Sequence, residues 1–539
     1  MIEAFWIPLL PPYLIGLVLS FLVEAMLTPR PVAPWRRPLA AVGVHVGVWT
    51  FAFALELMLF RRPYFAVANV LAIELVIVLV SNAKYQALRE PFVYPDFEYF
   101  TDAIRHPRLY LPFFGAWRAM VSGGGYGVAL WAGLTLEDSV TAGAGMWLVS
   151  FADLPQEHMF DPTAPAVPFF SHSGVLALCG FALAKGTGAW VDASVNASAD
   201  LRRIGLIAAL CAYARMERQP TIRLKQLAPF NPATELPRQS TVMPDLVVVQ
   251  SESFFDVRRA YPQVRRDVLA NFDLLKSESA RHGQLTVEAW GANTVRTEFA
   301  FLSGMPAAAL GVHQYNPYRR LAAKGFPTIA SYLKSLGYRT VCIHPFHGSF
   351  YRRDKILPLL GFEEFLDISH FAGVLPDGPY IGDRAVAERA LALLDSPGDR
   401  PLYLHVITME NHGPLHWEGV DKRTEQELMA QPVPQGCADL LAYTRHLRNA
   451  DAMFGALRRG LLARSRPAGL CIFGDHVPIM PTVYKQLGVV DGTTDYVIWH
   501  SWRAQLTDAD RVSSSALSTT FLAGMGVWPP EAVAARGLE

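Results

Sequence analysis

The sequence has 539 residues, more than one domain usually holds, so we expect at least two structural units. Hydrophobic residues make up 51% of it and charged residues only 18%, against about 25% charged in an ordinary soluble protein, which predicts a membrane part. The formal net charge is zero and the five cysteines are scattered, so a nucleic-acid partner, a zinc knuckle and a disulfide framework have no support.

Long apolar stretches gather near the N-terminus, and each is about the twenty residues needed to cross a bilayer. The first is not a convincing secretory signal, because no positive segment precedes it and further spans follow. We therefore predict a transmembrane domain of about four helices over residues 1–137. The stretches are residues 5–27, 39–60 and 64–82, with a weaker one at 117–136.

The distribution of Lys and Arg predicts how this domain is oriented. Loops 28–38 and 83–110 carry more basic residues than the hairpin that contains Arg61 and Arg62. Basic loops stay in the cytoplasm, so both loops are expected there. The start of the chain and everything after residue 137 are then expected outside.

Residues 138–243 are predicted to hold juxtamembrane helices and a linker. Apolar stretches 172–184 and 203–214 are short for spans and favour interfacial or buried helices; two additional crossings would still leave the C-terminal part outside. Residues 219–244 are rich in proline and polar residues, as linkers are.

Residues 244–539 have the pattern of an α/β domain. Short apolar runs without alternation are typical of strands buried on both faces, and segments with helical spacing lie between them. This predicts a mostly parallel, doubly wound sheet. The strands are expected at 245–250, 338–345, 401–408 and 469–475, and helices at 327–336, 384–395 and 440–463.

Polar side chains follow three of these strands. Glu252 comes after the first, His412 after the third, and Asp475 with His476 after the fourth. Ligands of open parallel sheets bind outside the carboxyl ends of the strands, so these residues are expected near one another. Together with a hydroxyl, Glu252 and the adjacent Asp475–His476 pair would offer mixed oxygen and nitrogen ligands to one divalent cation such as zinc, manganese or magnesium.

Thr294 lies in the stretch GANTVRTEFAFLSG, residues 291–304, before an apolar run. Glu298 is four residues further on, whereas a capping box needs three, so a simple cap explains the pattern poorly. A hydroxyl bound to a divalent cation loses its proton more easily, and a helix N-terminus favours a phosphate. Thr294 is therefore a candidate nucleophile, with a helix cap as the alternative.

Taken in order, several motifs resemble the lipoteichoic acid synthase family of the alkaline phosphatase and sulfatase superfamily. The resemblance covers roughly residues 244–525, and several helices before an extracytoplasmic domain also match the family's plan. The motifs are ESFFD (252–256), NTVRTEF (293–299), HPFHGSFYRRD (344–354), MENHGPL (409–415) and GDH (474–476).

The resemblance implies a phosphoglycerol transferase in the bacterial inner membrane with an extracytoplasmic catalytic domain. It implies a phosphatidylglycerol-like lipid donor, a glycan or polymer acceptor and a phosphothreonine intermediate on Thr294. The implied metal ligands are Glu252, Thr294, Asp475 and His476, and the implied headgroup-binding residues are Arg353, His347, Tyr351 and His412.

Some features depart from that family. Tyr351 stands where tryptophan is expected, and Arg296 occupies a place that is usually not basic. A phosphoethanolamine transferase or a sulfatase-like hydrolase of the same fold stays open, although NTVRT lacks the C/S-x-P-x-R sequence of common sulfatases. A membrane protein that only binds a surface polymer is the non-enzymatic alternative; Glu252 would then cap a helix, and His412 would be structural.

Overall fold

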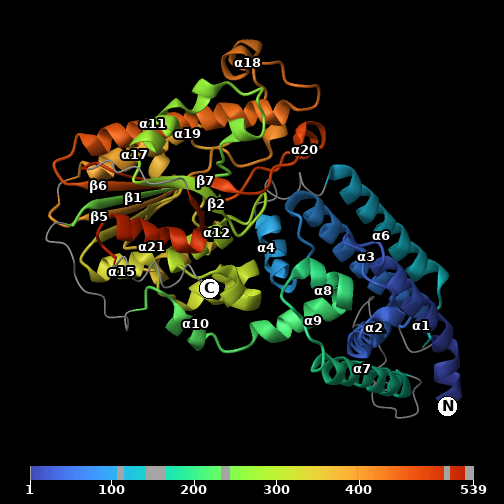
Figure 1. Ribbon diagram of the computed structural model, residues 1–539. Coiled ribbons are helices and arrows are strands. Elements are labelled where there is room, and N and C mark those ends of the chain that lie inside the picture. The colour runs from blue at the N-terminus through green and yellow to red at the C-terminus, as the bar shows by residue number, and fades with distance from the viewer. Residues whose placement is uncertain are drawn as a thin grey trace. The chain divides into compact units, whose positions relative to one another are not determined.

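The computed structural model describes residues 2–105, 115–140, 166–231, 243–396, 398–502 and 510–528. It divides into two compact units, Met1–Gln219 and Pro220–Glu539 (Figure 1). Parts of the predicted juxtamembrane segment and linker, at 141–165 and 232–242, lie outside the described residues.

The first unit is helical. Each of the predicted spans corresponds to a helix, because a backbone in an apolar stretch satisfies its hydrogen bonds most completely as a helix. The helices are α1 (Ile2–Glu24), α2 (Leu39–Phe60), α3 (Pro63–Leu88), α4 (Phe97–Arg105), α6 (Ala116–Leu136), α7 (Ala166–Gly188), α8 (Ala197–Ile204) and α9 (Leu206–Glu217).

Helix α7 corrects one prediction. The apolar stretch at 172–184 was judged too short for a span, but α7 has 23 residues. Within the described parts of the chain, three helical stretches are long and apolar enough to cross a membrane: α2, α3 and Phe169–Gly188 of α7. The apolar run is short because His172 and Lys185 interrupt it, whereas helical hydrogen bonding continues past both residues.

Helices α2 and α7 pack antiparallel at very short range. A Cβ atom on Gly47 would lie 2.5 Å from the backbone nitrogen of Ala184, and one on Gly180 would lie 2.6 Å from that of Phe51. Small residues at such positions let two helix backbones approach each other within a membrane. The pairing makes α7 an integral member of the bundle.

The structure also corrects the prediction that loop 28–38 and the exit toward the second unit lie on opposite sides of the bundle. The backbone N–H of Leu206, the first residue of α9, donates to Glu24 at the end of α1 (2.6 Å), and that of Val32 donates to Arg202 in α8 (2.9 Å). Loop 28–38 and the exit toward the second unit therefore share one side of the bundle. The charge count placed them on opposite sides.

The second unit contains one eight-stranded sheet in the order β4-β3-β5-β1-β6-β7-β2-β8. Only β7, among the strands described, runs against its neighbours. The α/β fold class is confirmed, and the four predicted strands form the contiguous centre of the sheet. The strands are β1 (Asp245–Ser251), β2 (Arg281–Thr286), β3 (Arg339–Ile343), β4 (Glu364–Leu366), β5 (Leu402–Ile407), β6 (Ala468–Gly474), β7 (Thr494–His500) and β8 (Asp510–Ser513).

Helices cover both faces of this sheet (Figure 1). One face carries α11 (Ala270–Glu278), α17 (Asp383–Leu394) and α19 (Ala438–Leu462). The other carries α12 (Thr294–Ser303), α15 (Ile329–Ser335) and α21 (Ser514–Gly524). The shorter helices are α10 (Ile222–Leu227), α13 (Ala307–Leu310), α14 (Pro317–Arg320), α16 (Arg353–Leu359), α18 (Lys422–Leu428) and α20 (Pro481–Leu487).

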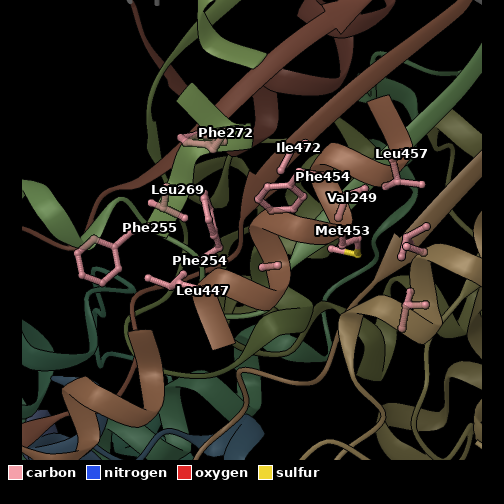
Figure 2. Packing of buried hydrophobic residues seen from close by; sticks show 14 of the residues in the cluster. Val249, Phe254, Phe255, Leu269, Phe272, Leu447, Met453, Phe454, Leu457 and Ile472 are labelled. Carbon is pink, nitrogen blue, oxygen red and sulfur yellow. The ribbon is translucent and has the colours of Figure 1, made fainter. Parts of the chain in front are cut away.

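Strand β1 shows why the central strands are apolar throughout. Val247 and Val249 belong to the core beneath α11 and α19, whereas Leu246 and Val248 belong to the core on the opposite face. Figure 2 shows Val249 among aromatic and aliphatic side chains of the first core. Because β1 is packed between two cores, its position in the sheet is fixed. The residue that follows β1 therefore also has a defined position.

Candidate active site

Three side chains that can bind a metal meet at the ends of β1 and β6. Glu252 follows β1, and Asp475 and His476 follow β6, its parallel neighbour. One ligand atom from each lies within 4.8 Å of the others, and all three residues are buried. His476 Nε2 is 3.5 Å from both Glu252 Oε1 and Asp475 Oδ2. The juxtaposition expected from the strand order is therefore present.

Ser253 and Gly474 hold this group together. Ser253 has left-handed backbone (φ 53), which places its N–H 2.9 Å from Asp475 Oδ1 and its hydroxyl 2.9 Å from Glu252 Oε1. A Cβ atom on Gly474 would lie only 1.7 Å from the carbonyl oxygen of Phe254. Glycine is required there because the backbone of the β1 exit passes directly over it.

Thr294 is the first residue of α12, and its hydroxyl faces the same group. Its Oγ1 is 3.5 Å from His476 Nε2. The residue before it, Asn293, is left-handed (φ 66) and makes no side-chain cap. Thr297 anchors the helix by donating to the backbone oxygen of Asp475 (2.7 Å). Thr294 is thus not the cap of α12, which leaves its hydroxyl for the site.

The residues present fit a divalent cation. His476 Nδ1 lies 3.1 Å from the carbonyl oxygen of Val477, which can only accept, so Nδ1 donates and the neutral ring would offer its lone pair from Nε2, the atom that faces the group. Within the residues that the structure describes, the buried Oδ2 of Asp475 has no partner at ordinary hydrogen-bond geometry, and His476 Nε2 lies 3.5 Å away. Burial, with the nearby Glu252, raises the pKa of Asp475 to about 7. A divalent cation between these two buried carboxyl groups would stabilise the charged form of both.

A fully buried ion pair lies behind Thr294. Arg353 Nη2 is 2.7 Å from Glu298 Oε2, and both side chains have 1% or less of their surface exposed. Arg353 Nη1 lies 3.0 Å from His344 Nε2, and the Tyr318 hydroxyl donates to Glu298. Burial would raise the pKa of Glu298, but Arg353 and Tyr318 lower it. The guanidinium predicted to bind a headgroup is therefore already paired with α12.

Two consecutive left-handed residues lead into Arg353. Tyr351 (φ 53) and Arg352 (φ 56) are neither glycine nor asparagine, so this backbone is strained. The turn directs Arg353 inward and leaves Arg352 exposed, with Tyr351 half-buried and its ring 5.2 Å from the Arg353 guanidinium carbon. His347, on the same loop, is exposed.

His412 and His347 are connected through two aromatic rings. Tyr380 packs edge-on against His412 (5.6 Å between ring centroids) and against Phe346 (6.1 Å), and Phe346 packs against His347 (5.2 Å). These ring contacts connect His412 with His347, whereas Arg353 is buried in its ion pair. Sequence inspection did not single out Tyr380 or Phe346.

Arg296, unexplained by the sequence, is a packing residue in this structure. Its side chain is buried, its Nε donates to the carbonyl oxygen of Tyr315 (3.1 Å), and its guanidinium lies 5.1 Å from the Tyr315 ring centroid. It joins α12 to residues 311–315. A cation–π contact with a hydrogen bond accounts for a basic residue at this place.

The family model described as Sulfatase matches residues 244–527, which is more than half of the chain. The chain belongs to the sulfatase family. The match spans the whole sheet from β1 to β8 and includes every candidate site residue. The predicted membership of the alkaline phosphatase and sulfatase superfamily is confirmed.

Two curated relatives of this sulfatase-family chain come from Rhizobium meliloti (strain 1021). Capsular polysaccharide biosynthesis protein RkpI is 34% identical over 257 residues, 47% of this chain and 45% of the relative. A putative cyclic beta-1,2-glucan modification protein is 27% identical over 252 residues, 47% of this chain and 38% of the relative. The matched region is thus less than half the length of either relative.

A solved structure resembles most of the length of this chain. The integral membrane protein lipooligosaccharide phosphoethanolamine transferase A (EptA) from Neisseria meningitidis has a TM-score of 0.52 over 90% of each chain, at 13% identity. This likeness concerns the fold: apolar helices followed by a sulfatase-type domain. The predicted fold class, a helical bundle before such a domain, is thereby confirmed.

Proposed function

We propose that this protein is a membrane-anchored, metal-dependent transferase that moves a phosphoglycerol-type group from a phospholipid headgroup to an extracytoplasmic glycan or polymer. Its catalytic domain lies outside the inner membrane in this proposal. The observation that carries it is the position of Thr294, whose hydroxyl lies at the N-terminus of α12 and 3.5 Å from His476 Nε2.

Glu252, Asp475, His476 and Thr294 would hold one divalent cation, which would make the threonine hydroxyl acidic and offset phosphate charge. The Thr294 oxygen attacks the phosphorus of the lipid phosphodiester. The bond from phosphorus to diacylglycerol breaks, and diacylglycerol leaves with a proton. An acceptor hydroxyl then attacks the phosphorus of the phosphothreonine diester, the bond from phosphorus to the Thr294 oxygen breaks, and the proton that the acceptor loses returns to Thr294.

The remaining predicted residues would bind the headgroup. His412, Tyr351 and His347 line the aromatic surface beside the site, and the first-turn N–H groups of α12 suit a phosphate. Arg353 is a weaker candidate for direct contact, because Glu298 already occupies its guanidinium. It supports the reaction by fixing α12 in this proposal.

A glycan acceptor is supported by the relatives. One is named for capsular polysaccharide biosynthesis and the other for modification of a cyclic glucan. Both names concern carbohydrate polymers, whose hydroxyl groups are the nucleophiles that the second step requires.

Turnover of phosphatidylglycerol by the full chain in lipid–detergent micelles tests the proposal. Release of diacylglycerol should fall by about a thousandfold in Thr294→Ala and persist in part in Thr294→Ser, which keeps a hydroxyl. Thr286→Ala is the matched control, because Thr286 is exposed on β2. Undiminished release by Thr294→Ala would remove the mechanism.

Phosphoethanolamine transfer is the second candidate. The observation that favours it is the similarity in fold between this chain and a phosphoethanolamine transferase. The same assay with phosphatidylethanolamine distinguishes the two donors, since each leaves a different headgroup on the acceptor.

A further inference from the structure

Tyr380 ends a tight turn beside the candidate site. The backbone N–H of Asp377 donates to the carbonyl oxygen of Tyr380 (2.9 Å), and Gly378 between them has φ 77. Residues 372–379 are exposed, whereas Tyr380 is half-buried. The ring therefore turns from an exposed loop toward the domain.

The phenol of Tyr380 reaches the backbone of the His412 loop. Its oxygen lies 3.2 Å from the carbonyl oxygen of Gly413, to which it donates, and 3.3 Å from His412 Nδ1. Burial, together with the carboxylates of Glu252 and Glu418, raises the pKa of Tyr380. The phenol therefore keeps its proton and stays a donor.

The geometry assigns the tautomer of His412. His412 Nδ1 lies 2.7 Å from the Gly413 carbonyl oxygen, which accepts and cannot donate. The imidazole proton is therefore on Nδ1, and the lone pair is on Nε2. His476 has the same arrangement toward the carbonyl of Val477, with Ser253 beside its Nδ1.

We propose that Tyr380 is a positioning residue that fixes the ring and tautomer of His412, so that Nε2 accepts a hydrogen bond from a hydroxyl of the substrate headgroup. The phenol and His412 Nδ1 share one carbonyl, and the edge-on ring contact limits rotation of the imidazole. The contact with a substrate headgroup rests on the proposed function. The arrangement of Tyr380 and His412 is observed and does not depend on it.

Kinetics of the full chain test the assignment. Tyr380→Phe keeps the ring and loses one hydrogen bond, so KM for phosphatidylglycerol should rise about fivefold with kcat within about twofold. In a His412→Gln background the same change should have no further effect, because Tyr380 acts through His412. Unchanged KM in Tyr380→Phe, or an additive effect in the double variant, would overturn it.

Tyr332→Phe is the matched control. This change also removes one hydrogen bond from a phenol to a backbone carbonyl, here that of Val527 (3.0 Å), which is not part of the candidate site. Both kinetic constants should stay at the wild-type values in this variant. A KM rise equal to that of Tyr380→Phe would show a general effect of losing a phenol and would overturn the assignment.

A second measurement is independent of turnover. Diethylpyrocarbonate modifies an unprotonated imidazole nitrogen, and mass spectrometry gives its rate at His412. The rate should fall at least about twofold in Tyr380→Phe, since the Gly413 carbonyl alone then holds the Nδ1–H tautomer and the ring orientation. Equal rates would overturn the proposal even if no lipid were consumed, whereas absence of turnover by the wild type would overturn only the proposed function.

Discussion

At the scale of single residues, the most consequential charge is Glu298. It lies one turn beyond Thr294, has no exposed surface and contacts both Arg353 and Tyr318. Its role as a partner of Arg353 was not predicted, because a sequence does not show which buried charges meet. The sequence placed Thr294 at a helix N-terminus only on the condition that the apolar run after it is helical, and α12 does begin at Thr294.

Removing one half of this ion pair should be costly. Glu298→Gln leaves Arg353 buried and uncompensated, which should lower the free energy of unfolding by about 3–5 kcal/mol. A double variant, Glu298→Gln with Arg353→Met, should recover part of that loss. Thermal unfolding of the full chain measures both.

Glu427→Gln is the control for the ion-pair prediction. Glu427 pairs with Arg423 on the surface, and such pairs contribute about 0–1 kcal/mol. A loss in Glu298→Gln no larger than in Glu427→Gln would contradict the account of α12.

At the scale of elements, the site depends on how closely the exits of β1 and β6 approach. The central strands were predictable because they are uninterrupted apolar runs buried on both faces. Strand β2 was missed because RHGQLT is polar and partly exposed, and its pairing with β7 is set by tertiary contacts. Ser253 was also missed, because its left-handed backbone and its contacts with Glu252 and Asp475 arise only in the folded domain.

Adding a methyl group between the two exits tests this dependence. In Gly474→Ala the new Cβ would lie 1.7 Å from the Phe254 oxygen, so backbone must move. The proposed site predicts about one divalent metal per chain in the wild type, measured by elemental analysis, and loss of that metal in the variant, together with a lower unfolding temperature. Gly419→Ala, at a glycine with open space, should change neither. Full metal occupancy in Gly474→Ala would count against the proposed ligand geometry.

At the scale of the whole molecule, the helical unit explains why counting charges misled. Arg37 forms a buried ion pair with Glu24, and Lys84 lies 2.6 Å from both Glu90 and Asp96. These basic residues are structural parts of the bundle, so they are poor indicators of the cytoplasmic side. With α7 as a span, α1 starts on the side opposite to α9.

Cysteine labelling of intact cells tests this orientation. With the catalytic domain outside, a cysteine at Trp35 (84% exposed) should react with an impermeant maleimide. A cysteine at Tyr64 (58% exposed), in the hairpin between α2 and α3, should react only after permeabilisation. The reverse pattern would place the basic loops in the cytoplasm, as the charges predicted, but with them the exit toward the second unit, which would contradict an extracytoplasmic catalytic domain.

The central claim is that Thr294 carries the transferred group. The full chain is incubated with phosphatidylglycerol, quenched in acid and digested with trypsin, which yields residues 282–296. Mass spectrometry should find a glycerophosphate adduct that fragmentation assigns to Thr294 and not to Thr286. Turnover of the lipid without any adduct on Thr294, or with the adduct on another residue, would contradict the account.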